Sequence, residues 1–385
     1  LHCAAGGSAI FGAVSRCWRA SGTRAFVVRR LGAPDAYVAT SNAARLCTRA
    51  NTHLAGWSAP RRWWEASLIC HIWRGLCRVL SKSRIIGWVF SDGMQGLILT
   101  ILGCYVCIDW LLRDVLQIAL LASVWDELLI LFCLFWIVWQ RTGHRQVRSI
   151  GANPLDPPVA VFIVVGLVLM SIVDPYPAIQ LSGYRATVQY ILWFFLITRR
   201  VQNDRDFMRV YITLCAVAFV LALHGIYQYL VGVPMPQNWV AAAETAVRTR
   251  VYSIFGSPNI MGDFMVLFVP MTVALAYHTK RPAAQACAWL AALVMCVACL
   301  FTMSRGAWVA MAAAIVTFIL LVDRRLFWLL LAAACVLVLV PFVRTRIGFL
   351  FTDDFVAANT NGGRAGRWEN GLAHLASVNP ATGFG

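Results

Sequence analysis

The stretch "AAQACAWLAALVMCVACLFTM", residues 283–303, contains no charged side chain. An α-helix rises 1.5 Å per residue, so about 20 apolar residues cross the ~30 Å hydrocarbon core of a bilayer. The whole chain of 385 residues has the same character, because 60% of them are hydrophobic, 13% are charged and the mean hydropathy is +0.69. Soluble domains carry about 25% charged residues. We therefore predict an all-α, polytopic membrane protein.

Apolar segments of this kind recur along the chain and predict about nine transmembrane helices. They are residues 94–111, 124–140, 159–173, 184–198, 207–230, 261–278, 283–303, 307–322 and 326–342.

Three segments flank this transmembrane domain of residues 94–342. Residues 1–60 lack sustained periodicity, so we expect them to be disordered or not native to the protein. Residues 61–93 mix aromatic and basic side chains, which fits either an interfacial helix or an ordinary basic lead-in. Residues 343–385 are expected to begin a large outer loop. The chain starts at Leu1 rather than Met and stops in this loop, so we expect a fragment.

The formal net charge of +16 is distributed as in a membrane protein rather than a nucleic-acid-binding protein. Residues 1–93 hold 13 Lys and Arg against 3 Asp and Glu, a net charge of +10. Short basic segments between the predicted helices read "QRTGHRQVR", "TRRVQNDRDFMR", "HTKRP" and "VDRR". Basic loops remain cytoplasmic in membrane proteins, so we place these loops and the N-terminus in the cytoplasm.

Arginines then fall on the outer side, where the positive-inside tendency disfavours them. Arg248 and Arg250 lie in "RTRVYSIFGSPN", Arg305 in "FTMSRGAWVA", and Arg364 and Arg367 in "NTNGGRAGRWENG". A guanidinium group stays charged and holds carboxylate or phosphate oxygens two at a time. The pattern favours an anion-binding site. The alternatives are that Arg250 extends to lipid head groups or pairs with Glu244, and that Arg305 is an interfacial anchor.

The segment Gly-Ser-Pro-Asn, residues 256–259, predicts a turn before the helix of residues 261–278. Pro258 fixes φ and favours an extended Ser257 before it. We expect Asn259 to cap a helix that starts near Ile260, and the helix-terminal amides could also face an anion.

Other chemical groups give weaker signals. His374 is expected to be a surface or packing residue, and His224 to make buried hydrogen bonds. Cys104 and Cys107 have CxxC spacing inside a predicted membrane helix, which favours apolar packing over metal or redox chemistry. Asp353 and Asp354 are adjacent in the chain and would not converge on one metal ion. We therefore expect no metal and no cofactor.

Three segments, in this order, are similar to the O-antigen ligase and polymerase-like membrane proteins of bacteria. They read "HGIYQYLVGVPMPQNWVAAAETAVRTRVYSIFGSPNIMGDFMVLFVPM", "TMSRGAWVAM" and "GRWENGLAHLASVNPATGFG". The resemblance covers roughly residues 220–385, and the order of the segments is more specific than any one of them.

The resemblance implies a metal-independent glycosyltransferase of the inner membrane with a periplasmic active site and a large periplasmic loop. Its donor would be a glycan on undecaprenyl pyrophosphate, and its acceptor lipid A-core, another glycan or a protein hydroxyl. Membrane lipids are further partners, and nucleic acid is not. The arginines implied to bind the pyrophosphate are Arg250, Arg305, Arg367 and Arg364. The implied base histidine lies beyond Gly385, so His374 is not assigned that role and the fragment is expected to be inactive.

Three other functions stay open. The first is an O-antigen polymerase, the second a small-anion (bicarbonate-like) transporter, and the third a structural role in assembly of the cell envelope. A transporter should have broken helices or polar groups near the middle of the membrane. The predicted helices are mostly apolar and the polar groups gather outside, which favours the enzyme.

Overall fold

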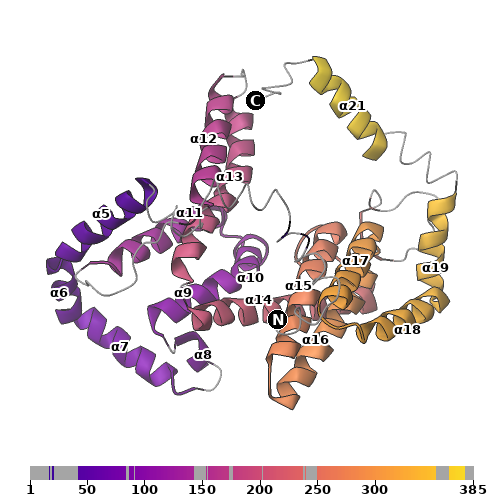
Figure 1. Cartoon of the computed structure of the whole chain (residues 1–385), viewed down its shortest axis with the longest axis horizontal. Helices are drawn as coiled ribbons and strands as arrows, with labels where there is room; N and C mark the ends of the chain where they lie inside the picture. Colours follow the sequence, from indigo (N-terminus) through magenta and orange to yellow (C-terminus); the bar gives the residue numbers. More distant parts are fainter. Residues whose placement is uncertain are drawn as a thin grey trace. The chain divides into compact units, whose positions relative to one another are not determined.

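A computed structural model describes residues 42–83, 86–90, 92–142, 153, 155–172, 177–201, 203–236, 239, 249–352 and 364–377, with Cys17 and Ala20. Helices and no strands occur among these residues, so the all-α prediction is confirmed (Figure 1). The chain divides into two compact units. The N-terminal unit is Gly22–Tyr211 with His374–Gly385, and the C-terminal unit is Ile212–Ala373 with Leu1–Ser21.

The N-terminal unit begins with four helices ahead of the apolar segments. They are α5 (Asn42–Gly56), α6 (Ala59–Ala66), α7 (Leu68–Leu80) and α8 (Ile86–Phe90). Helix α5 differs from the disorder expected for residues 1–60, whose first 41 positions lie outside the described residues except for Cys17 and Ala20. Residues 61–93 form several helices rather than one. Helix α7 exposes apolar side chains at helical spacing, which suits a membrane surface, and its interfacial position stays a prediction: Leu68, Ile69, Ile72, Leu76 and Val79.

The first predicted membrane helix is not continuous. It consists of α9 (Met94–Gly103), α10 (Tyr105–Trp110) and the π-helix η1 (Leu111–Val115), and the two parts are bent by 73°. Cys104 lies at the break with φ −93° and ψ 8°, outside the α-helical region. The prediction of one straight helix over residues 94–111 was therefore wrong in this respect.

Three longer helices complete the N-terminal unit: α11 (Ala119–Trp139), α12 (Asp156–Ile172) and α13 (Pro177–Arg200). Helices α12 and α13 lie side by side in Figure 1. Ile98 of α9 packs with Cys133 and Ile137 of α11 and with Leu196 of α13 in a buried apolar cluster. One face of each of α9, α11 and α13 thus contributes to this core.

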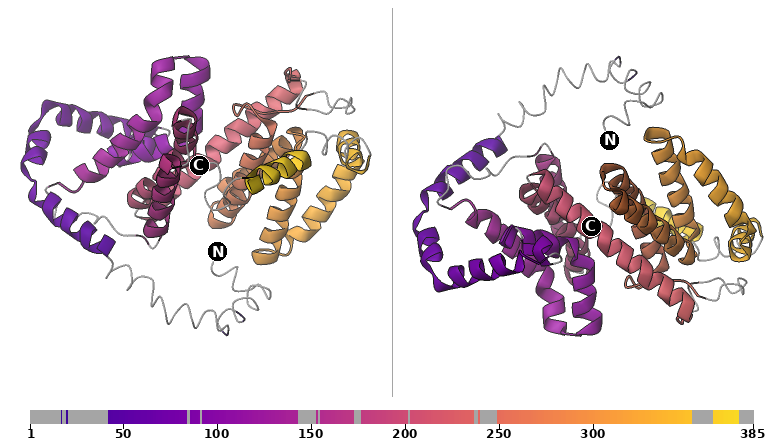
Figure 2. Two further views of the ribbon diagram at one scale, coloured as in Figure 1. Left: turned by 90° about the horizontal axis from the view of Figure 1, so that it is seen from above. Right: turned by 90° about the horizontal axis from the view of Figure 1, so that it is seen from below.

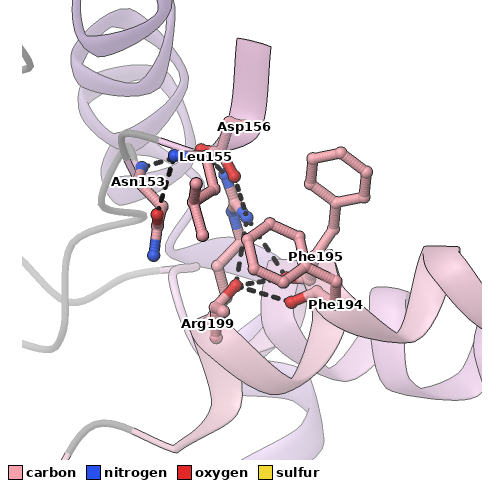
Figure 3. A network of polar contacts seen from close by, with 7 residues as sticks. Asn153, Leu155, Asp156, Phe194, Phe195 and Arg199 are labelled. Atoms are coloured by element: carbon pink, nitrogen blue, oxygen red, sulfur yellow. Dashed lines mark hydrogen bonds and ion pairs between the residues drawn. The ribbon is translucent and has the colours of Figure 1, made fainter. Parts of the chain in front are cut away.

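Arginines at the ends of these helices pair with carboxylates. Arg199 donates from Nη2 to Oδ2 of Asp156 at 2.7 Å and from Nη1 to Oδ1 at 3.3 Å. Figure 3 shows this pair with Asn153, whose backbone N–H donates to Asp156 Oδ2 at 2.8 Å. Arg209 forms a second pair with Asp92, 2.6 Å from Nη2 to Oδ2. Each pair joins segments far apart in the sequence.

The C-terminal unit is built from α14, which begins in the N-terminal unit, and the helices after it. Their bounds are α14 (Asp204–Val231), α15 (Pro258–His278), α16 (Pro282–Phe301), α17 (Arg305–Leu321), α18 (Leu326–Leu339), α19 (Pro341–Gly348), the short 3-10 helix η3 (Phe349–Phe351) and α21 (Arg364–Ser377). Helix α21 therefore lies within residues 343–385, the segment expected to begin a large outer loop.

Helices α15, α16 and α17 pack together, as the two views of Figure 2 show. Small side chains allow their backbones to approach, as in other membrane helix bundles. Gly262 of α15 is the tightest point, because a Cβ atom there would lie 2.6 Å from Cβ of Ala307 in α17. Met265 and Met295 are fully buried and fill the space between α15 and α16.

By length and composition, four of the described helices can cross a membrane, namely α11, α14, α15 and α16. The bent pair of α9 with α10 and η1 makes five if it is one span. Helices α12, α17 and α18 are apolar but shorter. A multi-pass membrane protein is supported, and the count of nine spans stays a prediction.

Candidate functional site

The candidate site is built around the tight connection between α16 and α17, residues 302–305, which we call the arginine turn. Thr302, Met303 and Ser304 are all buried. Met303 has φ +53°, a left-handed conformation that costs a non-glycine residue about 1–2 kcal/mol. The predicted helices of residues 283–303 and 307–322 leave residues 304–306 between them, whereas Arg305 is already the first residue of α17 and Ser304 its N-cap.

Arg250 supplies donors to this turn from another part of the chain. Its side chain is 6% exposed, and its Nε donates to the carbonyl oxygen of Thr302 at 3.0 Å. Nη1 donates to the Trp239 carbonyl at 2.6 Å, and Nη2 to Oδ1 of Asn259 at 3.1 Å. Hydrogen bonds from a charged donor stabilise a fold by about 1.5–3 kcal/mol each. Arg250 therefore joins the arginine turn to the start of α15.

The start of α15 differs from its prediction by two residues. Pro258 is the first helical residue and Ser257 is the N-cap, in the extended conformation that the sequence predicted. Asn259 was expected to be the cap, and that prediction was wrong. Proline is favoured at the first position of a helix because its missing N–H has no partner there anyway. The Asn259 side chain instead accepts the hydrogen bond from Arg250.

A second network fixes the segment that follows Arg250. Gln228 of α14 accepts from the Ser253 backbone N–H at 2.7 Å and donates to the Ser253 carbonyl at 3.0 Å. Nδ1 of His224 lies 3.0 Å from Oγ of Ser253, which confirms the hydrogen bonding expected for this histidine. Ser253 has φ +50°, so these contacts hold a strained residue in place.

Arg305 is half-buried at the first position of α17. Its guanidinium carbon lies 5.2 Å from the centre of the Phe349 ring, a cation–π contact worth about 0.5–1 kcal/mol at an exposed site. Phe349 begins η3, directly after α19. The Phe349 ring therefore supports the Arg305 side chain, which lies at a helix N-terminus, where a positive charge is not stabilised by the helix dipole.

Arg346 of α19 also reaches this turn, and the sequence analysis did not single it out. It is 5% exposed, and its Nε and Nη2 donate to the carbonyl oxygen of Met303 at 3.2 and 3.1 Å. A signal was available: Val-Arg-Thr-Arg occurs at residues 247–250 and again at residues 343–346. The last arginine of each copy donates to the arginine turn.

The remaining candidates lie on α21 or outside the described residues. Arg364 begins α21, Arg367 is exposed one turn later, and His374 is exposed near its end. Residues 353–363 and 378–385 are not among the described residues, and they include Asp353, Asp354 and the Pro380–Gly385 segment. The structure thus brings Arg250 to the turn that carries Arg305, and Arg364 and Arg367 belong to a separate helix, α21.

Positively charged side chains gather at the arginine turn. The acceptors named above for Arg250 and Arg346 are neutral oxygens, and the carboxylate of Asp263 in α15 is close enough to Cys299 to act on it electrostatically. The first residues of α15 and α17 add the partial positive charge of helix N-termini. The arrangement is suited to an anion with several oxygens, such as a phosphate or pyrophosphate.

At the opposite ends of α15, α16 and α17, the basic side chains lie in exposed loops. The "HTKRP" and "VDRR" loops meet there, because the hydroxyl of Tyr277 donates to Oδ2 of Asp323 at 2.7 Å. Lys280, Arg281, Arg324 and Arg325 are exposed at these loops, unlike the arginines of the arginine turn. This arrangement is consistent with basic loops on the cytoplasmic side.

In the described part of the chain, no three His, Cys, Asp or Glu side chains are grouped as metal ligands. Cys104 and Cys107 are half-buried and carry free thiols.

Comparison with known proteins gives one match. A family model described as O-Antigen ligase matches residues 290–385, which include Arg305, Arg346 and Arg367. The predicted resemblance to that family is confirmed in this range, whereas Arg250 lies before it. No curated protein and no solved structure matches the chain.

Proposed function

We propose that this chain is a membrane glycosyltransferase of the O-antigen ligase type. It transfers a glycan from undecaprenyl pyrophosphate to lipid A-core, another glycan or a protein hydroxyl on the periplasmic face of the bacterial inner membrane. The family match and the membrane-length helices support this class of protein. The observation that carries the proposal is the arginine turn, where three arginines converge.

The proposed reaction is a substitution at the anomeric carbon of the donor glycan. An acceptor hydroxyl oxygen forms a bond to that carbon while the bond from the carbon to the pyrophosphate oxygen breaks. The bonding electrons leave with the lipid pyrophosphate, and the hydroxyl proton passes to a base that the proposal does not assign. Guanidinium groups fixed in advance stabilise the negative charge that develops on the leaving group.

The arginines divide this work according to their surroundings. Arg305 is half-buried, and we assign it the contact with the pyrophosphate. Arg250 contributes its charge and also holds the turn through the Thr302 carbonyl. Arg364 and Arg367 on α21 are proposed to reach the same anion from the periplasmic loop. No metal and no cofactor enters this proposal.

The test is Arg305→Gln in membranes that contain the lipid-linked glycan donor and its acceptor. Loss of one fixed charged donor should lower the rate of transfer by about 10²–10³. The matched control is Arg324→Gln, an exposed arginine in the loop at the other end of α17. Product is measured as the glycan gained by the acceptor. A normal rate for Arg305→Gln, in protein that melts at the wild-type temperature, would contradict the role of this arginine.

Two other functions use the same charge differently. A polymerase would pass the glycan to a second lipid-linked glycan, so the acceptor that gains mass separates it from a ligase. A small-anion (bicarbonate-like) transporter is favoured by one observation, the 73° break between α9 and α10. Near that break Asp109 Oδ1 accepts from Arg113 and Trp125, and carboxylates do not attract anions. Bicarbonate uptake by vesicles that lack any glycan transfer would reverse the preference.

A further inference from the structure

Two side chains three residues apart, on one face of the segment formed by α19 and η3, contact the arginine turn. Arg346 donates twice to the Met303 carbonyl, and Phe349, three residues later, lies against the Arg305 guanidinium group. Residues three apart share one face of a helix. The segment therefore holds both the backbone of the turn and the side chain that leaves it.

The last arginines of the two Val-Arg-Thr-Arg copies donate to consecutive carbonyl groups. The backbone N–H of Val251 donates to the Phe301 carbonyl at 3.2 Å, and Arg250 donates to the next one, of Thr302. Arg346 donates to the carbonyl after that, of Met303. The connection between α16 and α17 is thus bound, residue by residue, by donors from two distant segments.

The consequence for Arg305 follows from the backbone geometry. Met303 is in the left-handed conformation, and its carbonyl is the group that Arg346 holds. If Nε and Nη2 of Arg346 no longer donate to the Met303 carbonyl, the turn gains alternative conformations. The direction in which the Arg305 side chain leaves α17 is then no longer fixed. A long side chain that must be ordered on binding weakens the binding, because its lost conformational freedom opposes association.

We propose that Arg346 is a positioning residue for anion binding by Arg305, with Phe349 as the second support. Arg346 acts through the Met303 carbonyl and does not itself contact the anion. The ligand class is a pyrophosphate, so the inference rests on the proposed function. It adds Arg346, which lies 43 positions after Met303 in the sequence and donates to its carbonyl group.

The experiment measures binding of inorganic pyrophosphate to the purified protein in detergent by isothermal titration calorimetry. Arg346→Gln should raise the dissociation constant about tenfold, and Phe349→Leu about threefold, as expected for lost preordering and a lost cation–π contact. Arg344→Gln is the matched control, because it removes an exposed arginine of the same helix and the same repeat. Its dissociation constant should stay within about twofold of the wild-type value.

A double variant separates positioning from direct contact. If Arg346 acts through Arg305, the variant with both Arg305→Gln and Arg346→Gln binds no more weakly than Arg305→Gln alone. Losses that multiply would mean that the two residues act independently and would overturn the inference. Wild-type affinity in Arg346→Gln would overturn it as well.

Folding is checked by thermal unfolding of each variant. If Arg346→Gln does not fold, Arg346→Lys and Phe349→Leu decide the matter, since lysine keeps the charge but lacks the planar fork of donors. Normal pyrophosphate binding in both would overturn the inference. A wild-type protein that binds pyrophosphate in an Arg346-dependent way but transfers no glycan would leave the positioning role standing and remove the proposed function.

Discussion

Two arginine pairs of the N-terminal unit differ from the contacts at the arginine turn. Arg199 pairs with Asp156, and Arg209 shares Asp92 with Arg205, so each has a carboxylate partner. Arg200 of the same unit does not follow this pattern, because it is 1% exposed and donates to the neutral Oε1 of Gln140. At the arginine turn the acceptors named for Arg250 and Arg346 are main-chain carbonyl groups and the Asn259 amide. Both arrangements tie distant segments together. They differ in the acceptors named, because a carboxylate carries a formal negative charge and a carbonyl or amide oxygen does not.

This difference separates two uses of the same side chain. An ion pair that joins helices stabilises the fold and has little attraction left for a ligand. A guanidinium group held by neutral oxygens is equally well ordered and keeps its charge, at an energetic cost that a bound anion would offset. The following predictions test that contrast.

The largest effect on stability is expected from the Arg209 and Asp92 pair. Arg209 has a side chain that is 2% exposed, and its loss leaves a carboxylate without its buried partner. Breaking such a pair costs about 3–5 kcal/mol, so Arg209→Gln should lower the melting temperature clearly. Arg205 provides the control, because it pairs with the same Asp92 at 3.3 Å but is 70% exposed.

Loss of an exposed partner costs about 0–1 kcal/mol, so Arg205→Gln should melt close to the wild type. Melting in detergent, followed by tryptophan fluorescence, provides the measurement. Equal losses in the two variants would show that the buried ion pair is not a special support of the N-terminal unit. Pyrophosphate binding should be unchanged in Arg205→Gln.

An intermediate effect is expected where α15 approaches the arginine turn. Gly262→Ala places a methyl group 2.6 Å from Ala307 and 3.4 Å from Oγ1 of Thr302. Overpacking of this kind costs about 1–3 kcal/mol and should displace the carbonyl that Arg250 holds. The control is Gly306→Ala, where nothing lies within 4 Å of the new Cβ. Gly306→Ala should be neutral or slightly stabilising, because alanine favours the helix.

The decisive comparison is the difference in melting temperature between these two glycine variants. Pyrophosphate titration adds a second readout, since only Gly262→Ala should weaken binding. If both variants melted alike, the close approach of α15 and α17 would not be what sets the turn.

The smallest effect is a pH dependence of stability from the contact between Tyr277 and Asp323, at the opposite end of α15 and α17 from the arginine turn. The hydrogen bond from Tyr277, with a backbone N–H from Arg325, lowers the pKa of Asp323 below its ordinary value. A lowered pKa means that the contact stabilises the fold above the unfolded-state pKa and is lost as the pH falls through the folded-state pKa. The gain is below about 1 kcal/mol, because the pair is exposed to solvent.

Tyr277→Phe should therefore melt slightly below the wild type at neutral pH and equal to it once Asp323 is protonated. Melting curves between neutral and strongly acidic pH give this difference directly. A gap that stays constant over the whole range would mean that the Asp323 carboxylate is not responsible. The arginine turn itself should show no such acid step in its carbonyl contacts.

The helices could be predicted from the sequence because the length of an apolar segment indicates the length of the helix. The run of residues 261–278 became α15 and that of residues 283–303 became α16, with shifts of a few positions. The break at Cys104 could not be predicted in this way, since the segment remains apolar through it and contains no proline.

The site was predicted in part. Arg250 and Arg305 stood out because arginine is unexpected in outer loops, and the structure brings them to one turn. Arg346 was missed because its partner, Met303, is 43 residues away and periodicity carries no information on such a contact. The role of Asn259 was mistaken because the helix begins at Pro258, two residues earlier than a capping Asn259 requires.

The contact between Arg346 and Met303 also sets an order of assembly. Residues emerge from the ribosome in sequence, so α16 and α17 are complete well before α19 exists. Until then the Met303 carbonyl lacks its charged donors, and the connection between the two helices is free to take other conformations. Helix α19, which is made later, therefore locks a turn made earlier, and the charge cluster is completed only after the membrane helices around it have been inserted.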